Sequence, residues 1–506
     1  MASALKKLPF FVVLMGLGSL IMMIPATYGW ATSDFVGMRI FFYGTILFGT
    51  LTLLVGLATA GYEPPNLARS QLLTLVAAFT VLPLMFAVPF AEATSNTSYA
   101  DAWFEMVSSF TTTGATLFDT PGLISSTLHL WRATVGWVGG FLVWVVAIAL
   151  FAPMNLGGFE VRSLGGYGQQ NHASIAQIGK VADSSERLSR YAVDFAPIYF
   201  GLTTVLWVIL IVLGETPSVA VIHAMSTIST SGISPIGGTY FSSAGFWGEV
   251  AIVVFFVFAI SRLTFSRGFV GETENPLWND PEVVVAGILI FLATTLLFVR
   301  HFVGSIEEAS ADVADAARAL WGSFFTVVSF LTTTGFESKY WDAATDWSGL
   351  QTPGLLLMGL ALIGGGVATT AGGVKLLRVY ALFRHSEREM DRLLHPSSVG
   401  GGGKDARRIR RQGAYISWIF FMLFAISIAT VMLLLSLTGI QFERGMVLAV
   451  AALSTTGPLA TIAAESPIDY AGLPVAARAI LGAAMVLGRL ETLALIALFN
   501  PDFWRK

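Results

Sequence analysis

The chain has 506 residues, of which 55% are hydrophobic and only 12% are charged, whereas soluble proteins carry about twice that charged fraction. Apolar runs of about 20 residues, long enough to cross a bilayer, recur throughout. A soluble globular protein is therefore excluded, and an all-α polytopic membrane protein is predicted. With no cysteine and six scattered histidines, disulfides, thiolate catalysis and Cys-ligated metal sites are excluded as well.

The first two apolar runs form a leading pair of transmembrane helices. Residues 8–30 follow Lys6 and Lys7 and lack a small-residue cleavage site, so we interpret them as a retained helix rather than a signal peptide. A second span is expected at residues 38–61. The polar stretch at residues 63–69, which contains two prolines, separates this pair from the rest of the chain.

The remaining chain repeats one pattern four times: an apolar helix, a shorter helix, a hydroxyl-rich turn that ends in glycine, and a second apolar helix. With the leading pair, this predicts ten spans. The helices are expected at residues 71–90, 100–110 and 130–152, then 191–213, 218–228 and 246–261, then 283–302, 316–331 and 353–365, and finally 415–437, 442–453 and 475–499. The leading pair would occupy residues 1–65, and the repeats residues 66–165, 166–275, 276–400 and 401–506.

The four turns have nearly the same sequence, which we call the hydroxyl–glycine motif. They read TTTG at residues 111–114, STSG at 229–232, TTTG at 332–335 and STTG at 454–457. Backbone carbonyls and Thr hydroxyls can replace the water around an alkali ion, and glycine permits the backbone angles that point carbonyls into a pore. Four such segments would close a fourfold ring within one chain. The alternative is that they are ordinary Ser/Thr turns between helices.

The basic residues predict the topology. No Lys or Arg occurs between residues 71 and 131 or between residues 214 and 248, whereas ten occur in the connection at residues 375–411. Because positive residues stay on the cytoplasmic side, both termini are expected in the cytoplasm and the four motifs open outward. Arg300, Arg318 and Lys339 in the third repeat depart from this pattern.

These features resemble the TrkH/TrkG/KtrB superfamily of potassium uptake proteins. The resemblance rests on the motifs within residues 111–116, 331–336 and 454–458, on GGGVATTAGGVK at residues 364–375, and on LGRLE at residues 487–491 before residues 503–505. The leading helix pair favours the TrkH branch. The resemblance implies four parallel helix–pore-loop–helix repeats around a pseudo-fourfold pore, in a multi-pass protein of the bacterial inner membrane.

The resemblance also implies where potassium binds and what gates its path. The potassium ion would be bound by a selectivity filter, with no organic cofactor and no catalytic residue. The broken helix of the third repeat would form an intramembrane gate. The implied filter residues are Thr112, Thr113, Gly114, Thr230, Ser231, Gly232, Thr333, Thr334, Gly335, Thr455, Thr456 and Gly457. The implied gate residues are Gly364, Gly365, Gly366, Thr369, Thr370, Gly372, Gly373, Lys375 and Arg489.

The chain departs from the family pattern at two places. Ser231, Gly232 and Ile233 stand where Gly-Gly-Phe is common, which affects the second filter segment. Ala368 and Thr369 stand where Gly and Ser are usual, so the gate segment is expected to be somewhat stiffer.

Two features carry alternative interpretations. Arg489 lies in the last apolar helix, where a charge is costly and tends to face a cavity. It is expected to hold the gate through backbone carbonyls, or else to snorkel or pair between helices. The stretch at residues 364–373 is expected to break its helix, because each glycine disfavours helix by about 1 kcal/mol relative to alanine. A close helix contact through small residues is the alternative.

The expected partners are membrane lipid, a second copy of the chain in a homodimer, and a cytosolic RCK-type nucleotide-binding subunit resembling TrkA, the last two implied by the resemblance. Nucleic acid is not expected. The basic connection at residues 375–411, which we interpret as a cytoplasmic loop, would either dock such a partner or anionic lipid, or serve only to set the topology.

We predict potassium-selective uptake. The alternatives are a less selective K⁺/Na⁺ transporter, a potassium cotransporter, a carrier with inverted repeats and an intramembrane enzyme. Four glycines in the four motifs argue against weak selectivity. All motifs fall on one side with two spans per repeat, which indicates parallel repeats rather than inverted ones. No catalytic dyad or metal cluster is visible in the sequence, so we do not expect an enzyme.

Overall fold

The computed structural model is helical, and it describes residues 9–61, 67–94, 97–118, 120–152, 157–161, 184–261, 280–304, 313–348, 352–395, 411–464 and 466–491. No β-strand occurs within these residues. The expected all-α fold is therefore confirmed.

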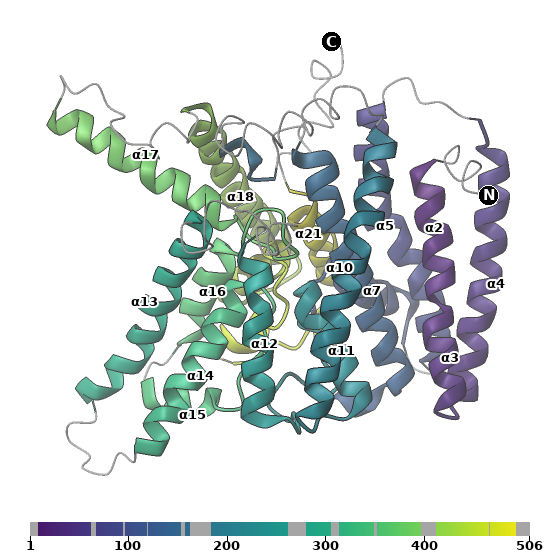
Figure 1. Ribbon diagram of the computed structural model, residues 1–506, viewed down its shortest axis with the longest axis horizontal. Helices are drawn as coiled ribbons and strands as arrows, with labels where there is room; N and C mark the ends of the chain where they lie inside the picture. The colour runs from purple at the N-terminus through teal and green to yellow at the C-terminus, as the bar shows by residue number, and fades with distance from the viewer. Residues whose placement is uncertain are drawn as a thin grey trace.

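The leading pair stands at the edge of the molecule (Figure 1). Helices α2 (Phe10–Ile21) and α3 (Met23–Ala31) follow one another, and α4 (Phe35–Ala58) runs back along both. Asp34 begins α4 by accepting a hydrogen bond from the Gly37 amide at 3.0 Å, the usual role of an N-cap residue. Most of the large side chains on the outer face of α4 are exposed, as expected for a helix that contacts lipid.

Each of the four repeats contains the expected sequence of long helix, short helix, motif and second helix. The first repeat has α5 (Leu67–Ala93), α6 (Tyr99–Phe110) and α7 (Ser126–Val146), and the second has α10 (Ser184–Val212), α11 (Pro217–Ser229) and α12 (Gly245–Ile260). The third has α13 (Pro281–Gly304), α14 (Val313–Leu331), α15 (Trp341–Ser348), α16 (Gly354–Ile363) and α17 (Leu376–Leu394). The fourth has α18 (Arg411–Leu437), α19 (Phe442–Leu453), α20 (Leu459–Ile462) and α21 (Val475–Leu490).

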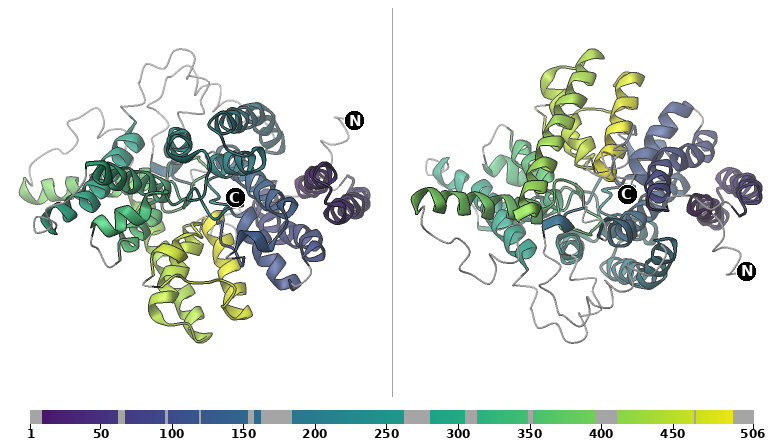
Figure 2. Two further views of the ribbon diagram at one scale, coloured as in Figure 1. Left: turned by 90° about the horizontal axis from the view of Figure 1, so that it is seen from below. Right: turned by 90° about the horizontal axis from the view of Figure 1, so that it is seen from above.

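The repeats surround a common centre in chain order, as the two end-on views of Figure 2 show. The second helix of each repeat packs against the short helix of the next: α7 against α11, α12 against α14, α16 against α19, and α21 against α6. The last of these contacts joins the fourth repeat to the first. The expected pseudo-fourfold arrangement, with the leading pair outside it, is thus confirmed.

Helices stand at all ten expected span positions, but three are short. Within the part of the chain that the structure describes, seven candidate spans have the length and hydropathy needed to cross a membrane. The other three are α12 with 16 residues, α16 with 10 and α21 with 16. Residues 492–499 of the last expected span lie outside the described residues. Helix α16 is short because the chain leaves the helix at Gly364, where the sequence predicted a break.

The basic connection at residues 375–411 differs from expectation, since its first half is helix α17 rather than a loop. This helix projects from the bundle at the upper left of Figure 1. Leu376, Leu377 and Ala381 are buried on its inner side, while Arg384 pairs with Glu387 at 2.7 Å on its surface. Such i,i+3 pairs support an exposed helix. Residues 396–410, including the four glycines at 400–403, lie outside the described residues.

Candidate ion-binding ring and the segment against it

Each short helix ends in the same way at its motif. The second hydroxyl residue of the motif has a positive φ: 56° at Thr112, 53° at Thr230, 58° at Thr333 and 55° at Thr455. This left-handed conformation is unusual for a β-branched residue. It is the backbone of a Schellman motif, in which glycine normally takes the left-handed position. Strained backbone of this kind clusters at functional sites, and here it is repeated four times.

The hydrogen bonds of the four helix ends are also equivalent. The amide of the third motif residue donates to the carbonyl five residues earlier in every repeat. These bonds join Thr113 to Ser108 at 2.8 Å, Ser231 to Ser226 at 3.0 Å, Thr334 to Ser329 at 3.0 Å and Thr456 to Ala451 at 2.8 Å. Four turns joined by coincidence would not share one geometry, so the motifs are one structural element used four times.

The first and third hydroxyls of each motif lie within hydrogen-bond distance of each other. The oxygen–oxygen distances are 2.8 Å for Thr111 and Thr113, 3.1 Å for Ser229 and Ser231, 3.1 Å for Thr332 and Thr334, and 3.3 Å for Ser454 and Thr456. The second hydroxyl is left for other partners. Within the described residues, Oγ1 of Thr112 and Oγ1 of Thr455 are buried without a hydrogen-bond partner. Such orphaned oxygens fit a ligand that accepts their lone pairs.

The four motifs together form a closed ring, which we call the motif ring. Each motif glycine faces the backbone or side chain of the next repeat, and the fourth faces the first. A Cβ atom would lie 2.1 Å from the Ser231 carbonyl oxygen if added at Gly114, 2.2 Å from the Thr334 oxygen at Gly232, 3.0 Å from the Pro458 ring at Gly335 and 2.2 Å from the Ala115 nitrogen at Gly457. A side chain at these positions would force the neighbouring repeats apart.

The fourth motif departs in detail from the other three. Gly114, Gly232 and Gly335 have φ values of 75°, 65° and 80°, whereas Gly457 does not adopt a positive φ. Its amide donates instead to the Thr113 carbonyl at 2.6 Å. Pro458 follows it and begins the short helix α20. The ring is therefore fourfold only approximately.

The electrostatics of the ring favour a cation of low charge. The C-terminal ends of α6, α11, α14 and α19 converge on it, and each carries the negative end of a helix dipole. The motifs themselves offer only neutral oxygens. Among the described residues there is no cluster of three or more His, Cys, Asp or Glu side chains able to hold a metal. Neutral carbonyl and hydroxyl oxygens are the ligands that potassium sites use.

The expected break in the third repeat lies directly against the motif ring. Residues 364–375, which we call the Gly-rich segment, run without helix between α16 and α17. Thr370 Oγ1 donates to the Ile228 carbonyl at 3.0 Å, and the Gly372 amide donates to Thr333 Oγ1 at 2.7 Å. A Cβ at Gly372 would lie 2.1 Å from the Ser454 carbonyl oxygen. The segment thus contacts the second, third and fourth repeats on the side where the motifs begin.

Arg489 adds the first repeat to these contacts. Its Nε donates to the Thr111 carbonyl and its Nη1 to the Thr370 carbonyl, both at 2.7 Å. The side chain is buried, which argues against snorkelling to the surface. The expected bond to a carbonyl of the Gly-rich segment is present, and the bond to the first motif was not anticipated. Glu491, two residues beyond Arg489, forms an ion pair with Arg378 at 2.8 Å.

The other residues singled out in the third repeat lie in the same segment. Thr369 Oγ1 donates to the Gly366 carbonyl at 2.7 Å, which tightens the turn. Lys375 ends the segment with a φ of 87° and donates from Nζ to the Ala371 carbonyl. Gly364, Gly366 and Gly372 each approach another backbone so closely that a Cβ would lie 2.1 Å from a carbonyl oxygen. Close packing therefore accounts for three of these glycines.

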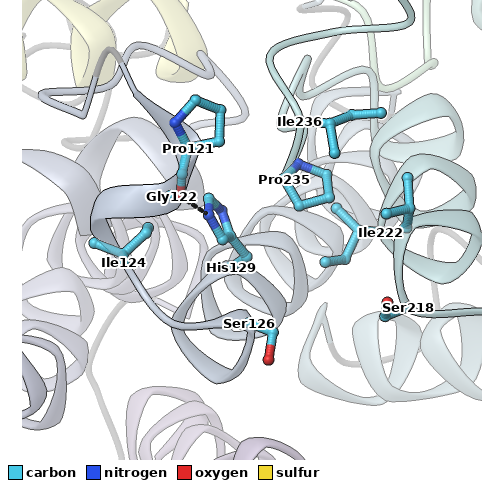
Figure 3. A pocket seen from close by; sticks show the side chains of 10 residues that line it. Pro121, Gly122, Ile124, Ser126, His129, Ser218, Ile222, Pro235 and Ile236 are labelled. Atoms are coloured by element: carbon cyan, nitrogen blue, oxygen red, sulfur yellow. Dashed lines mark hydrogen bonds between the residues drawn. The ribbon is translucent and has the colours of Figure 1, made fainter. Parts of the chain in front are cut away.

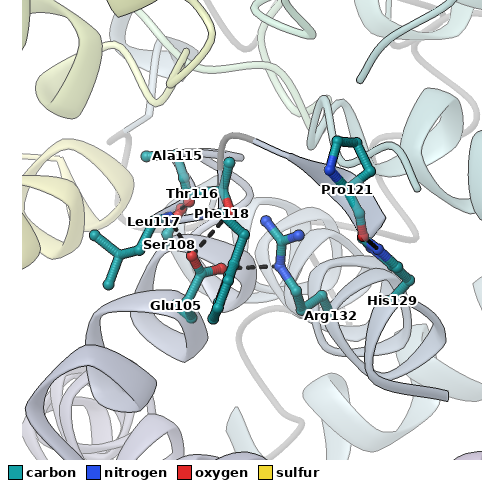
Figure 4. Close-up of polar contacts among 9 residues, drawn as sticks. All are labelled: Glu105, Ser108, Ala115, Thr116, Leu117, Phe118, Pro121, His129 and Arg132. Carbon is teal, nitrogen blue, oxygen red and sulfur yellow. Dashed lines mark hydrogen bonds and ion pairs between the residues drawn. The ribbon is translucent and has the colours of Figure 1, made fainter. Parts of the chain in front are cut away.

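Sequence reasoning missed the buried carboxylates that lie behind the ring. Glu105 on α6 pairs with Arg132 on α7 at 2.8 Å (Figure 4). Glu249 on α12 accepts hydrogen bonds from Trp321 Nε1 at 2.7 Å and Ser338 Oγ at 2.9 Å. An acidic residue inside an otherwise apolar helix is a signal in itself, and Glu249 would have been found by it.

A cavity of about 260 Å³ lies between the first and second repeats (Figure 3). Prolines and isoleucines form much of its wall, and His129 Nε2 lies 2.8 Å from the Pro121 carbonyl oxygen beside it. No motif residue lines it. The cavity is therefore separate from the motif ring.

Comparison with known proteins agrees with the ring and the repeats. The family model described as TrkH, cation transport protein, matches residues 38–506. The chain belongs to the TrkH family. It is 30% identical over 446 residues to the Trk system potassium uptake protein TrkH of Salmonella typhimurium, a match covering 87% of this chain and 86% of that protein. It is 27% identical over 453 residues to the Trk system potassium uptake protein TrkG of Escherichia coli, which covers 86% of each.

The fold of this chain also matches a solved structure along nearly its whole length. The crystal structure of the potassium transporter TrkH from Vibrio parahaemolyticus superposes with a TM-score of 0.79 at 25% sequence identity, covering 99% of both chains. The chain is therefore an integral membrane protein of a cation transport family.

Proposed function

We propose that the chain takes up potassium selectively across the bacterial inner membrane, and that the motif ring is its selectivity filter. The observation that carries the proposal is the ring itself: four equivalent helix ends, closed on one another through their glycines. A dehydrated cation needs oxygens on all sides, and one chain supplies them here by repetition. Potassium is the ion that the names of the similar proteins specify.

The Gly-rich segment is proposed to be the gate. It bonds to the second and third repeats, approaches the fourth, and is linked to the first by Arg489, so an ion leaving the ring on that side would meet it. The charge of Lys375 lies at its end and that of Arg489 lies next to it, and a buried positive charge repels a cation more strongly than the same charge in water. Displacing the segment would open the path.

The proposed orientation has both termini in the cytoplasm and the glycine ends of the motifs facing outward. Helix α17, with Arg378, Arg384, Arg388 and Arg392, projects from the end of the bundle at which α2 begins (Figure 1). Positive residues favour the cytoplasmic side. We further propose a homodimer that binds a cytosolic, TrkA-like nucleotide-binding subunit, with the domain boundaries given by the sequence.

The test is ion flux through the purified protein in liposomes, with K⁺, Rb⁺ and Na⁺ compared at equal concentration. We expect K⁺ and Rb⁺ to enter and Na⁺ to be excluded. Comparable Na⁺ entry would favour the less selective K⁺/Na⁺ transporter. Uptake of K⁺ that depends on a second ion on the same side would favour a cotransporter.

A further inference from the structure

In three of the four repeats, a buried polar side chain forms a hydrogen bond with the chain that follows the motif glycine, and we call this side chain the brace. The brace lies nine positions before that glycine: Glu105 on α6, His223 on α11 and Thr326 on α14. The equivalent position in the fourth repeat is Leu448 on α19. All four side chains are fully buried. The position is therefore shared, and its chemistry differs from repeat to repeat.

In the first repeat the brace is a carboxylate. Glu105 Oε1 accepts hydrogen bonds from Thr116 Oγ1 at 2.9 Å and from the Leu117 amide. Its Oε2 lies 2.8 Å from Arg132 Nε on α7. Figure 4 shows Glu105 between Arg132 on one side and Thr116 and Leu117 on the other. One side chain thus ties together a short helix, a long helix and the exit from the motif.

In the second repeat the brace is an imidazole, and it contacts the equivalent residue. His223 Nε2 lies 2.9 Å from Ser234 Oγ, and Ser234 is two residues beyond Gly232 as Thr116 is two beyond Gly114. Because Ser234 Oγ already donates to the Gly238 carbonyl at 3.1 Å, the imidazole is assigned as the donor to it.

The third repeat uses a weaker brace with help from a second helix. Thr326 Oγ1 accepts from the Ser338 amide at 3.3 Å, three residues beyond Gly335. Glu249 on α12 accepts from the Ser338 hydroxyl at 2.9 Å and from the Lys339 amide at 2.6 Å. The chain after this glycine is therefore also fixed by a buried carboxylate.

The fourth repeat lacks the polar face altogether. Six positions before the glycine, the first three repeats have Ser108, Ser226 and Ser329, and the fourth has Ala451. Ser108 Oγ donates to the Ala115 carbonyl at 2.7 Å, a contact that alanine cannot make. In the fourth repeat Tyr470 donates to the Gly457 carbonyl at 3.0 Å. That segment is therefore held by a residue outside the short helix.

We propose that Glu105, His223 and Thr326 are positioning residues that set ion selectivity by fixing the backbone after each motif glycine. This inference rests on the proposed function of the motif ring. Discrimination between K⁺ and Na⁺ depends on the number and the freedom of the coordinating carbonyls. After the first three motif glycines the chain has no regular hydrogen-bonded structure, so these side chains decide where its carbonyls point. Groups that contact a bound ligand directly need such support from neighbouring side chains to stay within about 0.5 Å of their working geometry.

The test removes one brace contact without touching a charge. Thr116→Val deletes the hydroxyl that bonds to Glu105, and Thr116→Ser keeps it. In the second repeat, Ser234→Ala deletes the hydroxyl that bonds to His223, and Ser234→Thr keeps it. Each variant loses the bond to the brace together with local bonds of the same hydroxyl, which join Thr116 to the Phe118 amide and Ser234 to Gly238 and Ile236. We expect the K⁺/Na⁺ flux ratio in liposomes to fall at least about two- to tenfold in Thr116→Val and Ser234→Ala. The ratio should be retained in Thr116→Ser and Ser234→Thr.

The matched control is Leu448→Met, which changes the equivalent position of the fourth repeat while conserving volume. Its flux ratio should remain that of the wild type. A double-mutant cycle of His223→Leu with Ser234→Ala adds a second readout. If the two residues act through one bond, the double variant should lose no more selectivity than the stronger single variant. Additive losses would overturn the assignment of His223.

The outcomes separate this inference from the proposed function. If Gly335→Ser lowers the flux ratio but Thr116→Val and Ser234→Ala do not, the ring is the filter and the braces are not positioning residues. If Gly114→Ser and Gly335→Ser also leave the ratio unchanged, the filter assignment itself fails. Should Thr116→Val fail to insert into the membrane, the pair at Ser234 decides, because Ser234→Ala removes only an oxygen atom.

Discussion

At Thr112, Thr230, Thr333 and Thr455, a branched side chain occupies a backbone conformation that usually selects glycine. The strain amounts to about 1–3 kcal/mol at each position, and glycine would relieve it. What glycine lacks is the hydroxyl, which at Thr112 and Thr455 is buried and unpartnered within the described residues. We infer that the strain is retained to keep an oxygen at the ring.

The sequence predicted the hydroxyls and glycines of the motifs but not the left-handed threonines. A run of three hydroxyl residues before glycine suggests a turn, and glycine is the residue that invites a positive φ. In the structure, the residue two positions before each glycine also has a positive φ. Aligning the four motifs by their glycines would also have exposed the polar positions at Glu105, His223 and Thr326 and the leucine at 448. Their partners, which follow the glycines, could only be found in the fold.

The motif glycines predict a graded response to substitution. Gly335→Ser should lower the K⁺/Na⁺ flux ratio while the protein still folds, because its Cβ would meet only the Pro458 ring at 3.0 Å. Gly114→Ser should be more severe, because its Cβ would lie 2.1 Å from the Ser231 carbonyl oxygen. Both also place a side chain at a positive φ, at a cost of about 1–3 kcal/mol. Liposome flux and thermal unfolding would measure the two effects.

Gly122→Ser is the control for these variants, since nothing lies within 4 Å of a Cβ at that position. Its flux ratio and unfolding midpoint should match the wild type. Wild-type selectivity in both Gly114→Ser and Gly335→Ser would remove the filter assignment.

Arg489 predicts an order of basal flux. Arg489→Ala frees the carbonyls of Thr111 and Thr370 and removes a buried positive charge from the path. Arg489→Lys keeps the charge but cannot bond two carbonyls with a planar fork. We expect Rb⁺ uptake without a partner subunit to be greatest for Ala, intermediate for Lys and least for wild type. Unchanged uptake in Ala, with the protein correctly inserted, would make Arg489 a structural residue only.

At the scale of elements, the break between α16 and α17 could be predicted from composition, whereas its contact with the motif ring could not. The glycines at residues 364–366 and 372–373 predicted that the helix would end. They could not predict that the segment reaches the motif ring, because that depends on Ile228 and Thr333 from other repeats. Helix α17 was missed for a different reason. Its many charged residues suggest a loop, although the spacing of Arg384 and Glu387 is typical of an exposed helix.

The Gly-rich segment predicts a leak when it is displaced. Gly366→Ala and Gly372→Ala should raise basal Rb⁺ uptake, because each added Cβ would lie 2.1 Å from a carbonyl oxygen and push the segment away. Deleting part of residues 364–373 should raise it further. Gly359→Ala on α16 is the control, since its Cβ meets nothing within 4 Å. Lower uptake in a well-inserted deletion variant would show that the segment does not obstruct the path.

For the molecule as a whole, the sequence predicted the class, the ten helix positions and the fourfold order of the repeats. Long apolar runs and a repeated motif are strong signals, and they can be recognised without any knowledge of contacts. The closure of the ring could not be predicted in detail. It depends on Gly457 meeting Ala115 and on α21 packing against α6, which are contacts between the two ends of the repeat series.

A ring that joins all four repeats predicts that potassium stabilises the entire protein. A ligand that binds only the folded state adds about 2.7 kcal/mol at a concentration 100 times its Kd. Replacing choline by K⁺ should therefore raise the thermal unfolding midpoint of the detergent-solubilised protein, and Na⁺ should raise it less. Gly335→Ser should weaken the difference between the two ions. Equal midpoints in K⁺, Na⁺ and choline would contradict ion binding at the ring.

The bond from Arg489 to Thr111 has a consequence for biosynthesis. It spans 378 residues, and the amide of Gly457 completes the first motif by bonding to Thr113. The first repeat enters the membrane long before either partner has been translated. Until then its strained threonine turn has no neighbour on one side, and contacts between distant parts of a chain form late. A ribosome that stops before residue 457 would leave three inserted repeats around an unfinished ring, so the ring forms only after nearly the whole chain has been made.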